Sequence, residues 1–95
     1  MILHTVNKSP ATHHCLAECA DVCTDTDSVL LIEDGVYGAL AQYQALLATP
    51  RKVYALMADV DARGLRNRLH AKVLLVDDTG FVQLAAEHDK VISWY

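Results

Sequence analysis

Residues 29–33 read VLLIE, and the first four positions are apolar without interruption. A run of this kind is typical of a strand that is buried on both faces of a parallel sheet. Asp34 and Gly35 follow as a turn, and Pro50 ends the segment beyond it. Between them, the apolar residues repeat at helical spacing and predict a helix: Val36, Leu40, Tyr43 and Leu47. A buried strand, a turn and a helix form the repeating unit of an α/β fold.

Four other segments have the composition of strands: MILHTV (1–6), KVYALM (52–57), AKVLLV (71–76) and KVISWY (90–95). Ser9 before Pro10 predicts the start of a helix that runs to about Cys23. A short helical turn is predicted in residues 58–65, ending at Gly64, and a further helix near residues 81–88. We therefore predict one domain over residues 1–95, of the α/β class, with three α/β/α layers and a mostly parallel sheet of about five strands.

In such sheets, ligands bind beyond the carboxyl ends of the strands. Four segments are expected there: His4–Ser9, Glu33–Tyr37, Met57–Arg63 and Asp77–Thr79. Glu33 and Asp34 suit an acid/base pair, although an Asp-Gly turn after a buried strand is the commoner meaning of this pattern. No glycine-rich phosphate loop is present, so we expect no cofactor.

Composition and charge narrow the function. The chain has 95 residues, a hydrophobic fraction of 53% and a net charge of −4. No basic run exceeds Arg51-Lys52, which argues against direct binding of nucleic acid. The first residues lack the pattern of a signal peptide, and no apolar run reaches the roughly 20 residues of a membrane span. We expect a cytoplasmic protein, away from membranes, with an apolar surface for a partner.

The segment HHCLAECADVC, residues 13–23, holds all three cysteines and two histidines. Cys15, Cys19, Cys23 and either His13 or His14 have the chemistry of zinc ligands, but positions i and i+8 of a helix lie about 12 Å apart. We therefore expect no metal site. On a helical wheel Cys19 lies at the middle of the apolar side, which favours packed cysteines over reactive ones. In the cytoplasm the thiols stay reduced.

Several segments in register resemble one family. They are ILHTVNKSP (2–10), VLLIEDGVYGAL (29–40), KVYAL with DVDARGL (within 52–65) and VDDTGFVQLAAEHDKVISW (76–94), and together they resemble the TusB/DsrH family over nearly the whole chain. The resemblance implies a fold like that of DsrE, DsrF and DsrH. It also implies a heterohexamer with TusC/DsrF-like and TusD/DsrE-like subunits, two copies of each chain.

Complexes of this family carry sulfur as a protein-bound persulfide. The resemblance implies a TusA-like donor, a TusE/DsrC-like acceptor, and a role either in 2-thiolation of the wobble uridine of tRNA or in oxidation of stored sulfur. It places the main acceptor cysteine on the TusD/DsrE-like partner, so this chain is expected to be an accessory subunit. DsrH-type members carry a cysteine in the pattern S-P-x(8)-C, which falls on Cys19 here.

Three hypotheses remain open at this stage. The chain is a sulfur-relay subunit with Cys19 as a secondary sulfur site, a purely structural interaction subunit with packed cysteines, or a metal or redox-sensing module on residues 13–23. The resemblance assigns nothing to Cys15, Cys23, His13 or His14. A sulfur carrier needs an accessible thiol, whereas the helical wheel places Cys19 at the centre of the apolar side.

Overall fold

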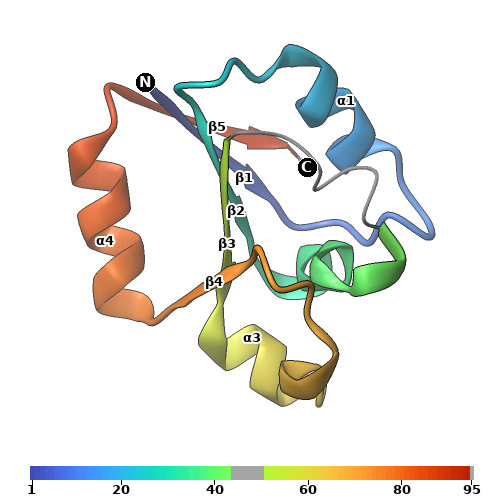
Figure 1. The fold of residues 1–95 in the computed structure, drawn as a ribbon. Helices are drawn as coiled ribbons and strands as arrows, with labels where there is room; N and C mark the ends of the chain where they lie inside the picture. The colour runs from blue at the N-terminus through green and yellow to red at the C-terminus, as the bar shows by residue number, and fades with distance from the viewer. Residues whose placement is uncertain (44–50, 95) are drawn as a thin grey trace.

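A computed structural model describes residues 1–43 and 51–94 (Figure 1). Its centre is a five-stranded sheet in the order β4-β3-β2-β1-β5. The strands are β1 (Ile2–Val6), β2 (Ser28–Leu31), β3 (Lys52–Leu56), β4 (Leu74–Val76) and β5 (Lys90–Trp94). Every pair of neighbouring strands is parallel. The predicted α/β class and the five strands are confirmed.

Helices cover both faces of this sheet. The α-helices are α1 (Cys15–Val22), α3 (Met57–Ala62) and α4 (Asp78–Glu87), and the 3-10 helices are η1 (Glu33–Ala39), η2 (Ala41–Tyr43) and η3 (Arg66–Arg68). The larger core packs residues of α1, η1 and α3 against one face of the sheet, and the smaller core packs α4 against the other. Figure 1 shows α4 on the opposite side of the sheet from α1. The three predicted layers are therefore present.

The first helix begins later than predicted. Ser9 and Pro10 form a turn, in which the Ser9 carbonyl accepts from the N–H groups of Thr12 and His13 at 3.2 and 3.0 Å. The α-helix starts only at Cys15. Threonine and histidine are weaker helix formers than alanine or leucine, so residues 12–14 do not extend the turn into a helix.

The segment after β2 is also different from the prediction. Residues 33–43 form two 3-10 helices instead of an α-helix, and Leu47 and Pro50 lie outside the described residues. The reason is the close approach of Gly35 to the sheet. A Cβ atom at Gly35 would lie 2.0 Å from the carbonyl oxygen of Val6. Glu33 also has a positive φ of 50°, so the chain leaves β2 in a tight bend.

Three predicted features of the C-terminal half are present: the turn at Gly64, the fourth strand and the last helix, which spans Asp78–Glu87 and so begins earlier than the predicted residue 81. Gly64 has a φ of 66° after α3, as expected of a residue that ends a helix. β4 is shorter than residues 71–76, because the Lys72 N–H donates to Nδ1 of His70 and keeps this part in a turn. α4 begins after Asp77, whose side chain accepts from the Gly80 N–H at 2.7 Å.

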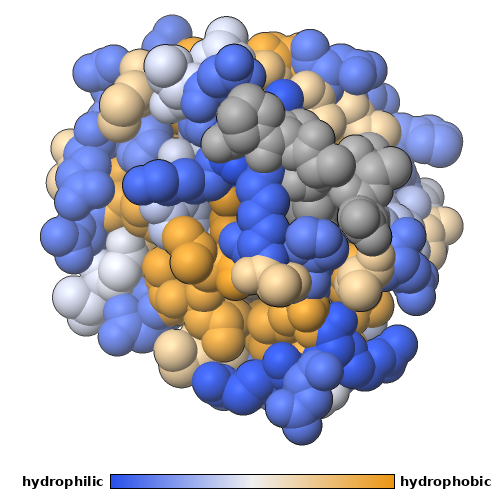
Figure 2. All heavy atoms as spheres, in the orientation of Figure 1, coloured by the Kyte–Doolittle hydropathy of each residue, from blue (hydrophilic) through white to orange (hydrophobic). Residues whose placement is uncertain are grey.

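An apolar area lies on the surface at the edge of the sheet. Figure 2 shows it in the region of β4, between α4 and α3. Leu74 on β4 and Val82 on α4 are exposed. Tyr37, Tyr43 and Trp94 instead pack against the larger core, so these aromatic side chains complete the interior. Within residues 1–43 and 51–94, no helix has the length and apolar character to cross a membrane.

Candidate functional site

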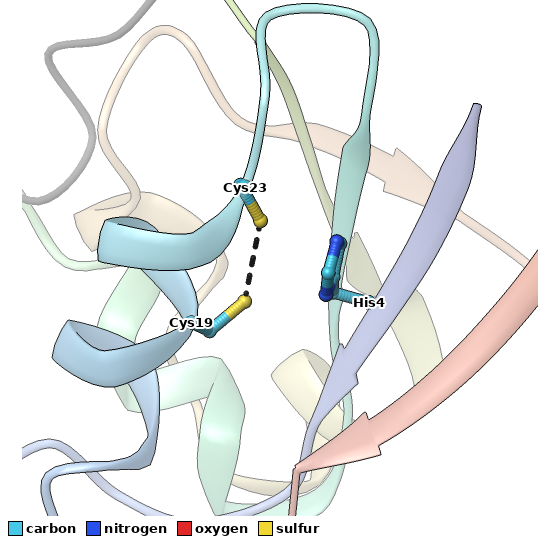
Figure 3. Close-up of side chains that lie close together, drawn as sticks. All are labelled: His4, Cys19 and Cys23. Carbon is cyan, nitrogen blue, oxygen red and sulfur yellow. Dashed lines mark hydrogen bonds between the residues drawn. The ribbon is translucent and has the colours of Figure 1, made fainter.

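Helix α1 places two of the three cysteines in the interior. Cys19 points toward the sheet and has no exposed surface, and Cys23, which follows the last turn, is 9% exposed. Their sulfur atoms lie 3.5 Å apart, within hydrogen-bonding distance (Figure 3). Cys15 at the start of the helix is partly exposed, and all three thiols are free. The wheel prediction that Cys19 is packed is confirmed.

Strand β1 adds His4 to the two thiols. A ring nitrogen of His4 and the sulfur atoms of Cys19 and Cys23 all lie within 4.8 Å of one another, and all three residues are buried. In Figure 3 the imidazole lies across from the two sulfur atoms. The sequence had pointed to His13 or His14 as companions of the cysteines. Neither histidine is part of this group, and nor is Cys15.

Both nitrogen atoms of His4 already have partners. The indole N–H of Trp94 donates to Nδ1 at 3.0 Å, and Nε2 lies 3.0 Å from Oδ2 of Asp27. Because an indole can only donate, Nδ1 carries the lone pair, and the proton of the neutral ring is on Nε2. His4 therefore donates to Asp27. It can act as a metal ligand or as a base only after one of these bonds is broken.

Asp27 anchors this chain of hydrogen bonds. Its side chain is 6% exposed, and it also accepts from the backbone N–H groups of Ile2 at 3.0 Å and Thr24 at 3.2 Å. Burial by itself raises the pKa of this carboxyl, but the hydrogen bonds from His4, Ile2 and Thr24 outweigh it and lower the pKa to about 2. Asp27 is thus a buried carboxylate with three donors.

The two thiols are electrostatically unequal. The hydrogen bond to Cys23 and burial in the core both raise the pKa of Cys19. The same hydrogen bond, received from Cys19, lowers the pKa of Cys23, and the positive charge of Arg51 lowers it further. Cys23 is consequently the sulfur atom on which negative charge is favoured, with Cys19 as its S–H donor.

Arg51, which precedes β3, is the cation beside this pair. It is 9% exposed, and its Nη2 lies 3.5 Å from the Cys23 carbonyl oxygen. Its Nε has no hydrogen-bond partner among the described residues. A buried guanidinium with an unused donor is costly unless an anion lies close by. The positive charge of Arg51 favours a thiolate at Cys23, because it lowers the pKa of that thiol.

The carboxyl end of the sheet, where the sequence predicted ligands, holds a different arrangement. Arg63 donates two hydrogen bonds to Oδ1 of Asp34 at 3.0 and 3.1 Å, and the Glu33 N–H donates to Asp59 at 2.7 Å. Asn7 donates to the Glu33 carboxylate at 3.4 Å. Asp34 is thus held by Arg63, and the geometry gives no support to a Glu33–Asp34 acid/base pair.

Two hollows lie outside the thiol pair. One, of about 230 Å³, is lined by residues that include Asp27, Ser28, Lys52 and His88. In it, His88 Nδ1 is bonded to the Leu84 carbonyl and Nε2 to the Ser28 hydroxyl, so the ring is a structural link. The other, of about 200 Å³, is lined by Met57, Ala58, Asp61, Asp77 and Asp78. Neither hollow contains a cysteine.

Sequence reasoning missed three members of the buried cluster, Asp27, Arg51 and Trp94, and it assigned His4 to a segment at the carboxyl end of the sheet instead. These residues are far apart along the chain and come together only in the folded sheet. A weak signal existed for His4, since a histidine inside an apolar strand needs buried partners. His70 has a structural role, because it accepts from the Lys72 N–H.

Comparisons with known proteins agree with this architecture. The family model described as "DsrH like protein" matches residues 8–91. Protein TusB of Enterobacter sp. (strain 638) is 38% identical over 96 residues, covering 98% of this chain and 100% of the relative. Protein TusB of Escherichia coli (strain K12) is 34% identical with the same coverage.

Two solved structures share the fold. The solution NMR structure of protein Tm0979 from Thermotoga maritima has a TM-score of 0.72 at 29% identity, and covers 94% of this chain and 95% of its own. The crystal structure of the ychN protein from E. coli has a TM-score of 0.75 at 18% identity, with 97% of each chain covered. From the family match and the near full-length TusB relatives together, we conclude that this chain belongs to the DsrH-like family.

Proposed function

We propose that the chain is a subunit of a sulfur-relay complex that handles protein-bound persulfide sulfur. The observation that carries the proposal is the likeness to TusB over 98% of the chain. The buried thiol pair beside Arg51 supports it, because persulfide chemistry needs a thiolate as nucleophile or leaving group. In this role the chain is an accessory subunit, and the main acceptor cysteine is on a partner.

The proposed partners are a TusC/DsrF-like and a TusD/DsrE-like subunit in a heterohexamer. A TusA-like protein would supply sulfur to that complex and a TusE/DsrC-like protein would accept it. The exposed apolar side chains of Leu74 and Val82 support a surface for other subunits. The proposal includes no direct contact with nucleic acid or with a membrane. It places the protein in the cytoplasm.

Two pathways fit a complex of this kind. The TusB relatives favour 2-thiolation of the wobble uridine in tRNA. Cys19 at the position of the DsrH-type cysteine favours oxidation of stored sulfur as the second candidate. Deleting the gene in its own organism separates them. Loss of 2-thiouridine from tRNA supports the first, and accumulation of stored sulfur with normal tRNA supports the second.

Reconstitution of the complex tests the proposal directly. This chain is co-expressed with the two related subunits of its organism, and native mass spectrometry measures the assembly. We expect two copies of each chain. Failure of this chain to join the other two, under conditions in which those two associate, would contradict the role as a subunit.

We further propose Cys19 as a secondary sulfur carrier. After the complex has reacted with a persulfide-loaded TusA-like donor, intact mass should show a gain of about 32 Da on this chain, mapped to Cys19. Cys15→Ser is the matched control, since Cys15 lies on the same helix but outside the buried pair. A complex in which Cys19 never carries sulfur would leave a purely structural subunit.

The complete burial of Cys19 is the observation that favours this structural alternative. It predicts slow labelling of Cys19 in the native chain and unchanged relay by the Cys19→Ser complex. A metal module is supported less well, because both nitrogen atoms of His4 are engaged by Trp94 and Asp27. Stoichiometric zinc in protein purified without a histidine tag would revive it.

A further inference from the structure

The buried pair contains a second thiol that neither the family pattern nor the comparisons assign. Cys23 lies 3.5 Å from Cys19 and is the member that keeps some exposed surface. We propose that Cys23 is the receiving thiol of this chain, which takes sulfur from a persulfide donor and passes it to Cys19 in the core. This inference rests on the proposed sulfur-relay function and adds a residue and a direction to it.

Access is the first reason for this direction. Cys19 has no exposed surface, whereas Cys23 is 9% exposed at the point where helix α1 ends. Of the two residues, Cys23 is therefore the one that a donor can approach from the surface. Cys23 also lies outside the regular helix, with an extended backbone at φ −61° and ψ 138°. Its sulfur can therefore move without unwinding α1.

Charge is the second reason. A thiolate at Cys23 is favoured by the S–H of Cys19 and by the buried guanidinium of Arg51, whose Nε has no partner among the described residues. Asp27 acts in the opposite direction on both thiols, because its negative charge raises their pKa values. His4 faces the pair as a neutral ring bonded to Trp94 and Asp27. The hydrogen bond from Cys19 is thus the larger influence that favours a Cys23 thiolate, and the positive charge of Arg51 adds to it.

The transfer balances without an oxidant or a reductant. The Cys23 thiolate attacks the outer sulfur of the donor persulfide, the donor S–S bond breaks, and the donor leaves as a thiolate. The terminal sulfur now on Cys23 is ionised, and it takes the proton of the Cys19 thiol. The Cys19 thiolate formed in this way attacks that terminal S–H sulfur, the Cys23 S–S bond breaks, and its electron pair stays on Cys23 as a thiolate, which leaves the persulfide on Cys19. Sulfur moves toward the thiol of higher pKa because the thiol of lower pKa is the better leaving group.

The arrangement also protects the cargo. A persulfide on Cys19 lies in the apolar core, where small thiols and water do not reach it without local opening of the structure. A persulfide that stays on Cys23 lies nearer the surface and is less protected. The two thiols therefore have separate tasks, one in receiving sulfur and one in holding it.

The test uses the isolated full chain with inorganic polysulfide as the sulfur source. Every variant carries Cys15→Ser, which removes the partly exposed thiol outside the pair. In the Cys15→Ser parent we expect a gain of about 32 Da, mapped to Cys19. Adding Cys23→Ser should slow the loading of Cys19 by about tenfold or more, because only local opening then exposes it. Equal loading of Cys19 with and without Cys23 would overturn the proposal.

Two further variants keep the test decisive. Cys19→Ser should trap the sulfur on Cys23, where a small thiol removes it faster than from the parent. Arg51→Gln keeps both thiols and should slow loading at neutral pH, with recovery as the pH rises and Cys23 ionises without its counter-ion. If Cys23→Ser unfolds the chain, which urea denaturation shows, Arg51→Gln decides alone. No effect of Arg51→Gln on loading at any pH would then overturn the proposal.

The mass of the product distinguishes sulfur transfer to Cys19 from reduction of that sulfur to hydrosulfide. If Cys19 attacked the inner sulfur of the Cys23 persulfide, a Cys19–Cys23 disulfide would form, hydrosulfide would leave, and the mass would fall by about 2 Da. That result would overturn the transfer step. This test uses the chain alone, so its result is independent of the reconstitution of the complex. If the chain loads sulfur through Cys23 but never joins its partners, the proposed role as a subunit is contradicted and this inference stands. If the chain joins its partners but does not load sulfur, the role as a subunit stands and this inference is contradicted.

Discussion

The polar side chains at the two ends of the parallel sheet form different kinds of interaction. At the carboxyl end, the side chains of Asp34, Asp59 and Arg63 form bonds at the surface. Toward the amino end, Asp27 and His4 form a hydrogen-bonded chain with exposures of 6% and 1%. The general rule for α/β sheets places ligands at the carboxyl end. In this protein the buried reactive groups are gathered away from it.

The comparison shows what burial does to polar groups. An exposed ion pair contributes little, because water and salt screen it. A buried carboxylate with three donors is costly to disturb. If one partner is removed, the polar groups that remain are buried without a hydrogen bond, and water cannot reach them to replace it. Four substitutions below compare the two ends of the sheet in order of expected effect on the free energy of unfolding, and two further substitutions, Gly38→Ala and Asp61→Asn, are controls for the first two.

The largest loss is expected from Gly35→Ala. The added methyl group would lie 2.0 Å from the carbonyl oxygen of Val6 and 2.8 Å from its carbonyl carbon, and both are backbone atoms that cannot rotate away. We expect a loss of about 3 kcal/mol or more, or failure to fold. Urea unfolding followed by circular dichroism measures it.

Gly38→Ala is the matched control within the same 3-10 helix. Its methyl group would lie 2.6 Å from Cδ2 of Leu16, which is the end of a flexible side chain. The loss should be smaller, about 1 kcal/mol. Equal losses for the two variants would show that the backbone contact of Gly35 is not what fixes this segment at the carboxyl end.

Asp27→Asn is expected to cost about 2 kcal/mol at neutral pH, because the neutral side chain is a weaker acceptor for His4, Ile2 and Thr24. The folded pKa of about 2 lies below the unfolded value of 3.8, so the contribution of Asp27 is complete above about pH 4. It is lost as the pH falls from about 4 through 2. Urea unfolding at several pH values should show this loss in the native chain and not in Asp27→Asn.

Asp61→Asn provides the exposed counterpart. Asp61 also has a lowered pKa, caused by its hydrogen bonds from Arg66 at 2.7 and 2.8 Å, but the pair lies at the surface. We expect little change in stability or in its dependence on pH. If Asp61→Asn altered acid stability as strongly as Asp27→Asn, burial would not be the cause of the difference.

Trp94→Phe should have an intermediate effect at the buried cluster. Phenylalanine keeps the ring beside His4 but removes the indole N–H that donates to Nδ1 at 3.0 Å. An unpaired nitrogen in the core should cost about 1 kcal/mol. Far-UV circular dichroism in urea measures the loss, and an unchanged midpoint would mean that His4 finds another donor.

The smallest effect is expected from Asp34→Asn at the carboxyl end. Its carboxylate is 63% exposed, and Arg63 keeps Asp59 as a second partner at 3.8 Å. The expected loss is within about 0.5 kcal/mol, and salt should reduce it further. A loss as large as that of Asp27→Asn would remove the contrast between the two ends of the sheet.

Local patterns predicted the strands well because each is a short apolar run, as at residues 29–33, and these runs need a sheet covered on both faces. The 3-10 helices after β2 could not be predicted in this way. Their cause is the contact of Gly35 with Val6, which lies 29 positions earlier. The spacing of Val36 and Leu40 fits both an α-helix and a 3-10 helix. The contact of Gly35 with the sheet therefore determines which of the two forms.

The candidate site was predictable only on helix α1. Helical spacing predicted that Cys19 is packed, because the neighbours on its side of the wheel are apolar. His4 and Trp94 meet because β5, at the edge of the sheet, pairs with β1. Asp27 gives no signal inside the polar segment TDTDS. Its role depends on the position of β1 next to β2.

The hydrogen bond from Trp94 to His4 has a practical consequence. Trp94 is the single tryptophan of the chain, and it packs against the same core cluster as Cys19 and Cys23. Its fluorescence therefore reports from beside the thiols without any added dye. Stopped-flow emission after mixing with a sulfur donor would follow the events at the pair in real time, in a protein that carries its own optical probe.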